Sequence, residues 1–233
     1  MDLSRLCLGT WAERLERGRR AGAFAGLQRF LLLPILTAAM VATATQAEDA
    51  KTAAVPKPEL DAKMRYCEVC HGPSAQGFVG YYPVPRLAGQ QVEYLEIQLK
   101  SFSEQKRANN IMFNVGHVLS PAMITALANG FHDLNPPPLR GAPADLAAAG
   151  RKIFEDGISD SNVPPCASCH GADAKGNGEF PRLAGQIYPY IVKQLSDWSK
   201  ERHEEASAIM EPIAHSLTPA QVKAVAAYVN GLE

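Results

Sequence analysis

Three features that define large classes of protein are missing from this sequence. There is no cluster of lysine and arginine of the kind that binds nucleic acid, and the 23 basic residues nearly balance the 24 acidic ones. No segment shows sustained alternation of apolar and polar residues, so half-buried strands are not expected. The apolar run at residues 30–41 contains Pro34 and is shorter than the roughly 20 residues that cross a bilayer. These absences favour a mostly helical, soluble protein without a nucleic-acid partner.

Residues 1–47 have the order of segments found in a secretory signal peptide. Arginines precede the apolar run, and small residues follow it as far as Ala47. An uncleaved membrane anchor is the alternative, and the short apolar run disfavours it. We therefore predict export to the periplasm, with residues 48–58 forming a linker before the first domain.

Cysteine is scarce, and its placement is informative. Of the five cysteines, Cys7 lies in the predicted signal, and the other four form two pairs that are each followed by a histidine. The two motifs are Cys67, Cys70 and His71, and Cys166, Cys169 and His170. Two residues between cysteines within one helical turn are poor geometry for a structural disulfide.

The spacing Cys-x-x-Cys-His is the attachment signature of c-type haem. Two thiols one helical turn apart can add to the two vinyl groups on one edge of a porphyrin, and the adjacent histidine is then carried under the ring to bind iron. A zinc site is the alternative, but neither half has a second thiol or histidine pair that would complete a tetrahedron. We therefore expect two covalently bound haem c groups.

The chain is an internal duplication. The hexapeptide Pro-Arg-Leu-Ala-Gly-Gln occurs without substitution at residues 85–90 and again at residues 181–186. Each copy then has an amphipathic helical pattern, an Ile-Met pair, and a hydroxyl residue followed by proline, which predicts the start of a final helix. The proline-rich segment 135–138 separates the copies. We predict an all-α chain with two domains, at residues 59–137 and 138–233.

An iron atom held by one histidine needs a sixth ligand, and each half offers a methionine and a histidine at equivalent positions. Met112 and Met210 precede the final helix in what should be a loop, and His117 and His215 lie five residues after them. We prefer the methionines, because a thioether stabilises ferrous iron and gives the high potential of an electron carrier. Of the remaining histidines, His132 reads as solvated.

The repeated hexapeptide supplies candidates for supporting roles. The carbonyl groups of Pro85 and Pro181 could accept a hydrogen bond from the second nitrogen of each proximal histidine, and a rigid turn is the compatible simpler reading. Arg86 and Arg182 could pair with haem propionates, with surface exposure as the alternative.

The two Cys-x-x-Cys-His sites, the hexapeptide after each, and a methionine ahead of a Leu-Ser/Thr helix together resemble the dihaem cytochrome c4 family. The resemblance covers nearly all of residues 59–233 and implies two tandem class I cytochrome c domains with His/Met ligation at both irons. One departure is in the first final helix, where Asn129-Gly130-Phe131 stands in place of Ala227-Tyr228-Val229. A helix-weakening glycine there makes the first half the less regular one.

The resemblance implies a periplasmic one-electron carrier and not an enzyme. Its expected partners are redox proteins: a quinol-oxidising complex, a terminal oxidase or a dehydrogenase, with peripheral membrane association as a further expectation. The alternative is a dihaem subunit fixed in a flavocytochrome or another dehydrogenase complex. A dihaem enzyme is a third reading, and it would require an open or unusual iron site.

Overall fold

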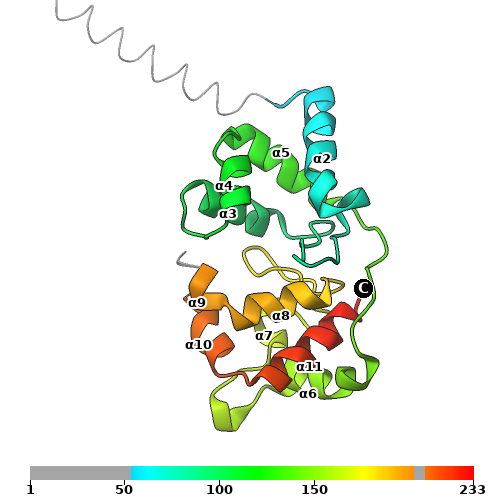
Figure 1. Cartoon of the computed structure of the whole chain (residues 1–233), viewed down its shortest axis with the longest axis vertical. Coiled ribbons are helices and arrows are strands. Elements are labelled where there is room, and N and C mark those ends of the chain that lie inside the picture. The colour runs from blue at the N-terminus through cyan, green and yellow to red at the C-terminus, as the bar shows by residue number, and fades with distance from the viewer. Residues whose placement is uncertain (1–53, 202–207) are drawn as a thin grey trace, which may run out of the picture. The chain divides into compact units, whose positions relative to one another are not determined.

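The computed structural model describes residues 54–201 and 208–233, and these are all-helical (Figure 1). The predicted signal peptide and most of the predicted linker lie outside the described residues. Extended pairing within the described residues is limited to isolated bridges, such as Phe78 with Val84. The absence of period-two patterning in the sequence therefore predicted the fold class correctly.

The first half contains four α-helices and a short 3-10 turn. They are α2 (Lys57–His71), η1 (Pro73–Ala75), α3 (Val92–Ser103), α4 (Asn110–Gly116) and α5 (Pro121–His132). The second half contains η2 (Ala144–Leu146), α6 (Ala147–Asp156), η3 (Ser159–Ser161), α7 (Ala167–His170), α8 (Tyr188–Ser196), α9 (Trp198–Glu201), α10 (Met210–His215) and α11 (Pro219–Asn230). Among the described residues, the first helix is α2, which begins at Lys57, inside the last residues of the predicted linker.

The final helix of each half starts as its sequence predicts. Ser120 caps α5 by accepting a hydrogen bond from the Met123 backbone N–H at 3.2 Å. Thr218 forms a capping box with Gln221 at the start of α11. Proline at the first helical position of both helices lacks only an N–H that would have no partner inside the helix. The caps fix where the buried stripe of each final helix begins.

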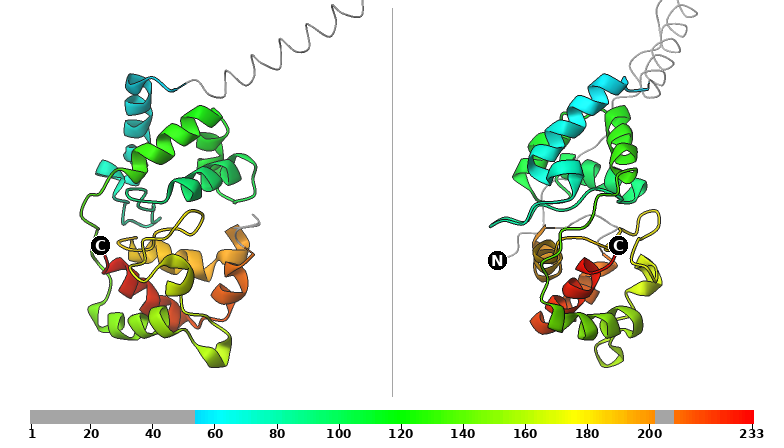
Figure 2. Two further views of the ribbon diagram at one scale, coloured as in Figure 1. Left: turned by 180° about the vertical axis from the view of Figure 1, so that it is seen from behind. Right: turned by 90° about the vertical axis from the view of Figure 1, so that its right-hand side faces the viewer.

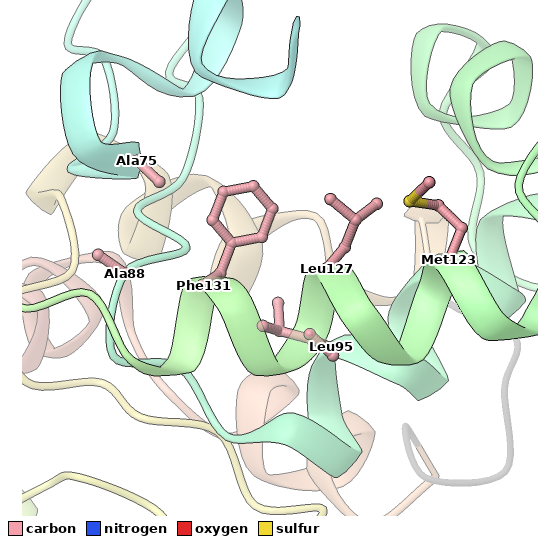
Figure 3. Packing of buried hydrophobic residues seen from close by; sticks show 7 residues of the cluster. Ala75, Ala88, Leu95, Met123, Leu127 and Phe131 are labelled. Atoms are coloured by element: carbon pink, nitrogen blue, oxygen red, sulfur yellow. The ribbon is translucent and has the colours of Figure 1, made fainter. Parts of the chain in front are cut away.

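Each half has its own apolar core built on that stripe. In the first half, Leu127 and Phe131 of α5 pack with Leu95 of α3, and the small residues Ala75 and Ala88 close the cluster (Figure 3). In the second half the buried members come from α6, α8, α11 and the loops between them: Phe154, Ala174, Ala184, Ile191, Val225, Ala226 and Val229. Burying each large side chain contributes about 1.5–3 kcal/mol.

Glycines set the closest helix contacts. A Cβ at Gly150 of α6 would collide with the Ala224 carbonyl oxygen of α11, so only glycine permits this approach. In the first half, a Cβ at Gly130 would lie 2.8 Å from the Met64 sulfur. The glycine that weakens α5 in the sequence therefore makes room for Met64 of α2, while Phe131 stays buried in the core.

The halves differ in how the first helix meets the cysteine pair. Cys67 and Cys70 lie on the last turn of α2, whereas residues 157–165 separate α6 from Cys166. The linker between the halves has no regular structure over residues 134–141 and runs as an extended trace from α5 towards α6 (Figure 2). Among the described residues no single helix could cross a membrane. Taken together, α4 and α5 are long and apolar enough to span a membrane, but the two helices are bent by 113° relative to each other.

Candidate functional site

The first cysteine-histidine motif ends α2. Gly72 terminates the helix with a φ of +78°, which favours glycine, and the chain turns back towards Pro85. The His71 side chain is 7% exposed, and its Nδ1 lies 2.8 Å from the Pro85 carbonyl oxygen. A carbonyl can only accept, so Nδ1 carries the proton and Nε2 keeps a free lone pair. Burial also lowers the pKa of His71, which keeps the ring neutral.

The second motif repeats this geometry. Gly171 ends α7 with a φ of +80°, and His170 is 6% exposed. Its Nδ1 lies 2.9 Å from the Pro181 carbonyl oxygen, and burial lowers its pKa as well. Each histidine is thus a neutral, oriented imidazole with one nitrogen available to a metal.

The four cysteines of the two motifs form no disulfide. Burial raises the pKa of Cys67 and of Cys166 to about 11, so both are protonated at neutral pH. Cys70 and Cys169 are exposed. Metal binding uses the thiolate, so the buried thiols are poor metal ligands in this form.

One cavity of about 550 Å³ is lined by both cysteine pairs, both histidines and both methionines. Its volume lies within the ~300–1,000 Å³ of ordinary ligand sites. The expectation that Met112 and Met210 lie in loops was wrong, because they belong to α4 and α10. The Asn109 side chain accepts from the Met112 N–H at 3.0 Å and so starts the helix at that point.

The competing histidines do not line this cavity. His117 is exposed, and its Nδ1 lies 2.9 Å from the Phe113 carbonyl oxygen of its own helix. His215 is also exposed and contacts the Ser199 hydroxyl at 3.3 Å. The methionine pair therefore lines the cavity and the histidine pair does not, a difference that their equivalent positions in the sequence could not show.

The arginines of the hexapeptide lie at the cavity wall. Arg86 is 3% exposed and donates from Nε to the Ala88 carbonyl at 3.0 Å, and Arg182 makes the same bond to Ala184. Burial and the neighbouring Arg182 lower the pKa of Arg86 to about 10. In the described part of the chain the Arg86 Nη1 is buried and has no hydrogen-bond partner.

An orphaned guanidinium nitrogen beside an apolar cavity calls for an anionic acceptor. A haem brings a flat apolar ring and two carboxylates, so the residues present fit this group. They match it in three respects: paired thiols, neutral imidazoles and a buried arginine with one orphaned nitrogen, around an apolar space.

A further cation was missed by the reasoning from sequence. Arg107 is 7% exposed, lines the same cavity and lies 4.6 Å from the ring centre of Phe102. It donates to Gln98 Oε1 at 2.5 Å, to the Tyr190 hydroxyl at 2.8 Å and to Gln194 Oε1 at 2.9 Å. All three acceptors are neutral, so its charge is buried without a carboxylate among them.

Comparisons with known proteins identify the family of this chain. The Cytochrome c family model matches residues 147–233. Cytochrome c-552 of Acidithiobacillus ferridurans is 41% identical over 71% of this chain and 73% of its own. The thiosulfate dehydrogenase electron acceptor of Thiomonas intermedia is 37% identical over 70% of this chain and 76% of its own.

Cytochrome c4 itself appears among the relatives and among the solved structures. The protein from Thiocapsa roseopersicina is 32% identical over 71% of this chain and 86% of its own. The cytochrome c4 structure from Acidithiobacillus ferrooxidans is 41% identical, covers 71% of this chain and 98% of its own, and superposes with a TM-score of 0.63. A cytochrome c domain implies covalent haem c, and two cysteine-histidine motifs suggest two such groups. The chain belongs to the cytochrome c4 family of electron-transfer proteins, which have two cytochrome c domains and are not enzymes.

Proposed function

We propose that this protein is a periplasmic dihaem carrier of single electrons. Each haem c is bound through thioether bonds to one cysteine pair, and each iron has one histidine and one methionine ligand. The ligand sets are Cys67, Cys70, His71 and Met112 in the domain at residues 59–137, and Cys166, Cys169, His170 and Met210 in the domain at residues 138–233.

The observation that carries this proposal is the cavity whose lining contains both complete ligand sets and excludes His117 and His215. A haem c bound there supplies a one-electron ferric/ferrous couple. The protein contributes the rest. Pro85 and Pro181 fix the proximal imidazoles, the apolar lining keeps water away, and buried Arg86 provides a cation for a carboxylate.

The electron partner we propose is a dehydrogenase that oxidises a small inorganic sulfur compound. The support is the name of the Thiomonas intermedia relative, which accepts electrons from thiosulfate dehydrogenase. A quinol-oxidising complex as donor and a terminal oxidase as acceptor are the other candidates. A dihaem subunit permanently bound to a flavoprotein is the second form of the same chemistry.

Haem counting tests the attachment sites. The exported protein should give two haem c groups per chain in the pyridine haemochrome assay. The paired change Cys67→Ser with Cys70→Ser should leave one, and Cys166→Ser with Cys169→Ser should also leave one. A pair of changes that leaves both haems bound contradicts the assigned attachment.

The partner is tested with purified proteins. Thiosulfate and a thiosulfate dehydrogenase should reduce the protein in a reaction whose rate rises with carrier concentration, because a mobile carrier meets its donor by diffusion. Thiosulfate alone is the control. Co-purification with a flavoprotein at fixed stoichiometry would support the subunit reading instead.

A further inference from the structure

Each copy of the repeated hexapeptide ends in a buried glutamine that reaches into the other half. Gln90 and Gln186 are each 5% exposed. Gln186 of the second half binds the backbone of Arg86, and Gln90 of the first half binds the backbone of Arg182. The contacts are therefore reciprocal, and the same hexapeptide supplies both partners.

The contact with the first half uses both ends of the Gln186 amide. Its Oε1 accepts from the Arg86 N–H at 2.8 Å, and its Nε2 donates to the Arg86 carbonyl at 3.0 Å. The same Oε1 also accepts from the Ile187 N–H at 3.0 Å. A reversed amide would place N–H groups against N–H groups, so the orientation is fixed.

The contact with the second half is its counterpart. Gln90 Oε1 accepts from the Arg182 N–H at 2.6 Å, and Gln90 Nε2 donates to the Arg182 carbonyl at 3.0 Å. The Gln91 N–H also donates to Gln90 Oε1, at 2.9 Å. Both copies thus repeat one hydrogen-bond pattern, bond for bond.

The glutamines are themselves held by the last residue of each final helix. The ring of His132 contacts the Gln90 carbonyl oxygen at 2.8 Å, and Asn230 donates from Nδ2 to the Gln186 carbonyl at 2.9 Å. His132 is exposed, as the sequence predicted, and its ring nevertheless shares this role with Asn230. The pinned main chain leaves each side chain little freedom to move away from its target.

The arginine N–H that donates to each glutamine belongs to the same peptide group as the carbonyl that holds a proximal histidine. The carbonyl of Pro85 and the N–H of Arg86 are two ends of one resonant amide. That carbonyl accepts from His71 Nδ1, and that N–H donates to Gln186 Oε1. Accepting the N–H polarises the amide and makes its carbonyl a stronger acceptor, an effect on the order of 10–30% per bond.

We infer that each glutamine is a positioning residue for the proximal histidine of the opposite half: Gln186 acts on His71, and Gln90 acts on His170. The inference rests on the proposed function, in which these histidines bind iron. A stronger carbonyl acceptor gives the imidazole more anionic character, which favours ferric iron and lowers the reduction potential. Removing a glutamine should therefore raise the potential of the haem in the other half.

The test uses the haem-loaded, full-length mature protein with Gln186→Leu or Gln90→Leu. Proton NMR of the reduced protein follows the Nδ1–H resonance of each proximal histidine, and stepwise oxidation followed by NMR gives each haem its own potential. Gln186→Leu should move the His71 resonance upfield and raise the first-half potential, leaving the His170 resonance in place. Gln90→Leu should do the reverse. A shift in the same half, equal shifts in both halves, or no shift would overturn the inference.

Gln91→Leu is the matched control. Gln91 also bridges the halves, since its Nε2 donates to the Lys175 carbonyl at 2.8 Å. The N–H of that peptide group, on Gly176, donates to the main-chain carbonyl of His170 at 2.9 Å, and the His170 ring is held by the Pro181 carbonyl instead. This variant loosens the same interface and should leave both histidine resonances unchanged. A crossed shift here would mean that any lost contact between the halves produces the effect, and the inference would fall.

A conservative variant keeps the test decisive if a leucine variant does not fold. Gln186→Glu loses the donor to the Arg86 carbonyl but retains the acceptor for the Arg86 N–H, and a carboxylate accepts more strongly than an amide. The His71 resonance should then move downfield, opposite to the leucine variant, and the His170 resonance should not move. An upfield or absent His71 shift would count against the inference.

The same spectra separate this inference from the ligand assignment. In the unmodified protein, the ring protons of His71 and His170 should carry the large ring-current shifts of haem ligands. Their absence would contradict the proposed function, whatever the crossed pattern. Their presence without crossed shifts would overturn the inference alone.

Discussion

Arg107 of the first half donates a hydrogen bond of 2.9 Å to Gln194 Oε1 of the second half. The bond joins two buried side chains, and the three acceptors of the Arg107 guanidinium in the described part of the chain are all neutral. A buried cation beside a redox site favours the reduced state, because reduction adds a negative charge nearby. Arg107 is therefore placed to raise the potentials of both proposed haems.

Replacing this cation should make the protein easier to oxidise. We expect Arg107→Met to lower both reduction potentials by an amount on the order of 1 kcal/mol in reduction free energy, as measured by potentiometric titration. Arg140→Met removes an equal charge from an exposed side chain bound to Glu233 and should change the potentials little. Equal effects of the two variants would contradict a local role for Arg107.

The methionine assignment predicts separable optical changes. The ferric protein should show the sulfur-to-iron band in the near infrared, and Met112→Ala and Met210→Ala should each remove about half of it, since each contributes one ligand. His117→Ala and His215→Ala change residues outside the cavity lining and should leave the band intact. A band that survives both methionine changes would show that the irons have other ligands.

The close contact of α6 with α11 predicts a stability effect in the second half. We expect Gly150→Ala to lower the free energy of unfolding by about 1–3 kcal/mol, because its Cβ would meet the Ala224 backbone. Gly141→Ala is the control, as nothing lies within 4 Å of a Cβ there. Urea titration monitored by circular dichroism measures both. A Gly150→Ala variant as stable as the control would mean that the helices separate at little cost.

Asn230 predicts a second stability effect, this time through hydrogen bonds. It is 2% exposed and donates to the Leu139 and Gln186 carbonyls, both at 2.9 Å. Asn230→Ala leaves these groups without their partner, and we expect a loss of about 1–3 kcal/mol in unfolding free energy. Asn129→Ala removes an exposed bond within α5 and should cost less than about 0.5 kcal/mol. Comparable losses in the two variants would argue that the Asn230 bonds to Leu139 and Gln186 contribute little to stability.

The attachment motifs and the helical class were predictable because both are local patterns. A cysteine pair followed by histidine is visible within five residues, and an amphipathic stripe within one helix. The helix that carries Met112 was not visible, since seven residues of α4 show no clear period and the helix depends on the Asn109 cap.

The contacts between the halves could not be predicted from local patterns. Repetition marked Gln90 and Gln186 as noteworthy, but repetition alone cannot show that each copy binds the other and not itself. Arg107 had no such mark, because the residue five positions before Met210 is Glu205. Its burial arises only when the two halves come together around it.

The proline-rich linker, which Asn230 holds through a hydrogen bond to the Leu139 carbonyl, has a kinetic consequence. Because one chain carries both halves, each meets the other at an effective concentration that short tethers set in the millimolar range, whatever the concentration of the protein. Electron exchange between the two proposed centres is then a first-order event. Dilution slows the encounters of this carrier with its partners, but it leaves the rate of electron exchange between its own two proposed centres unchanged.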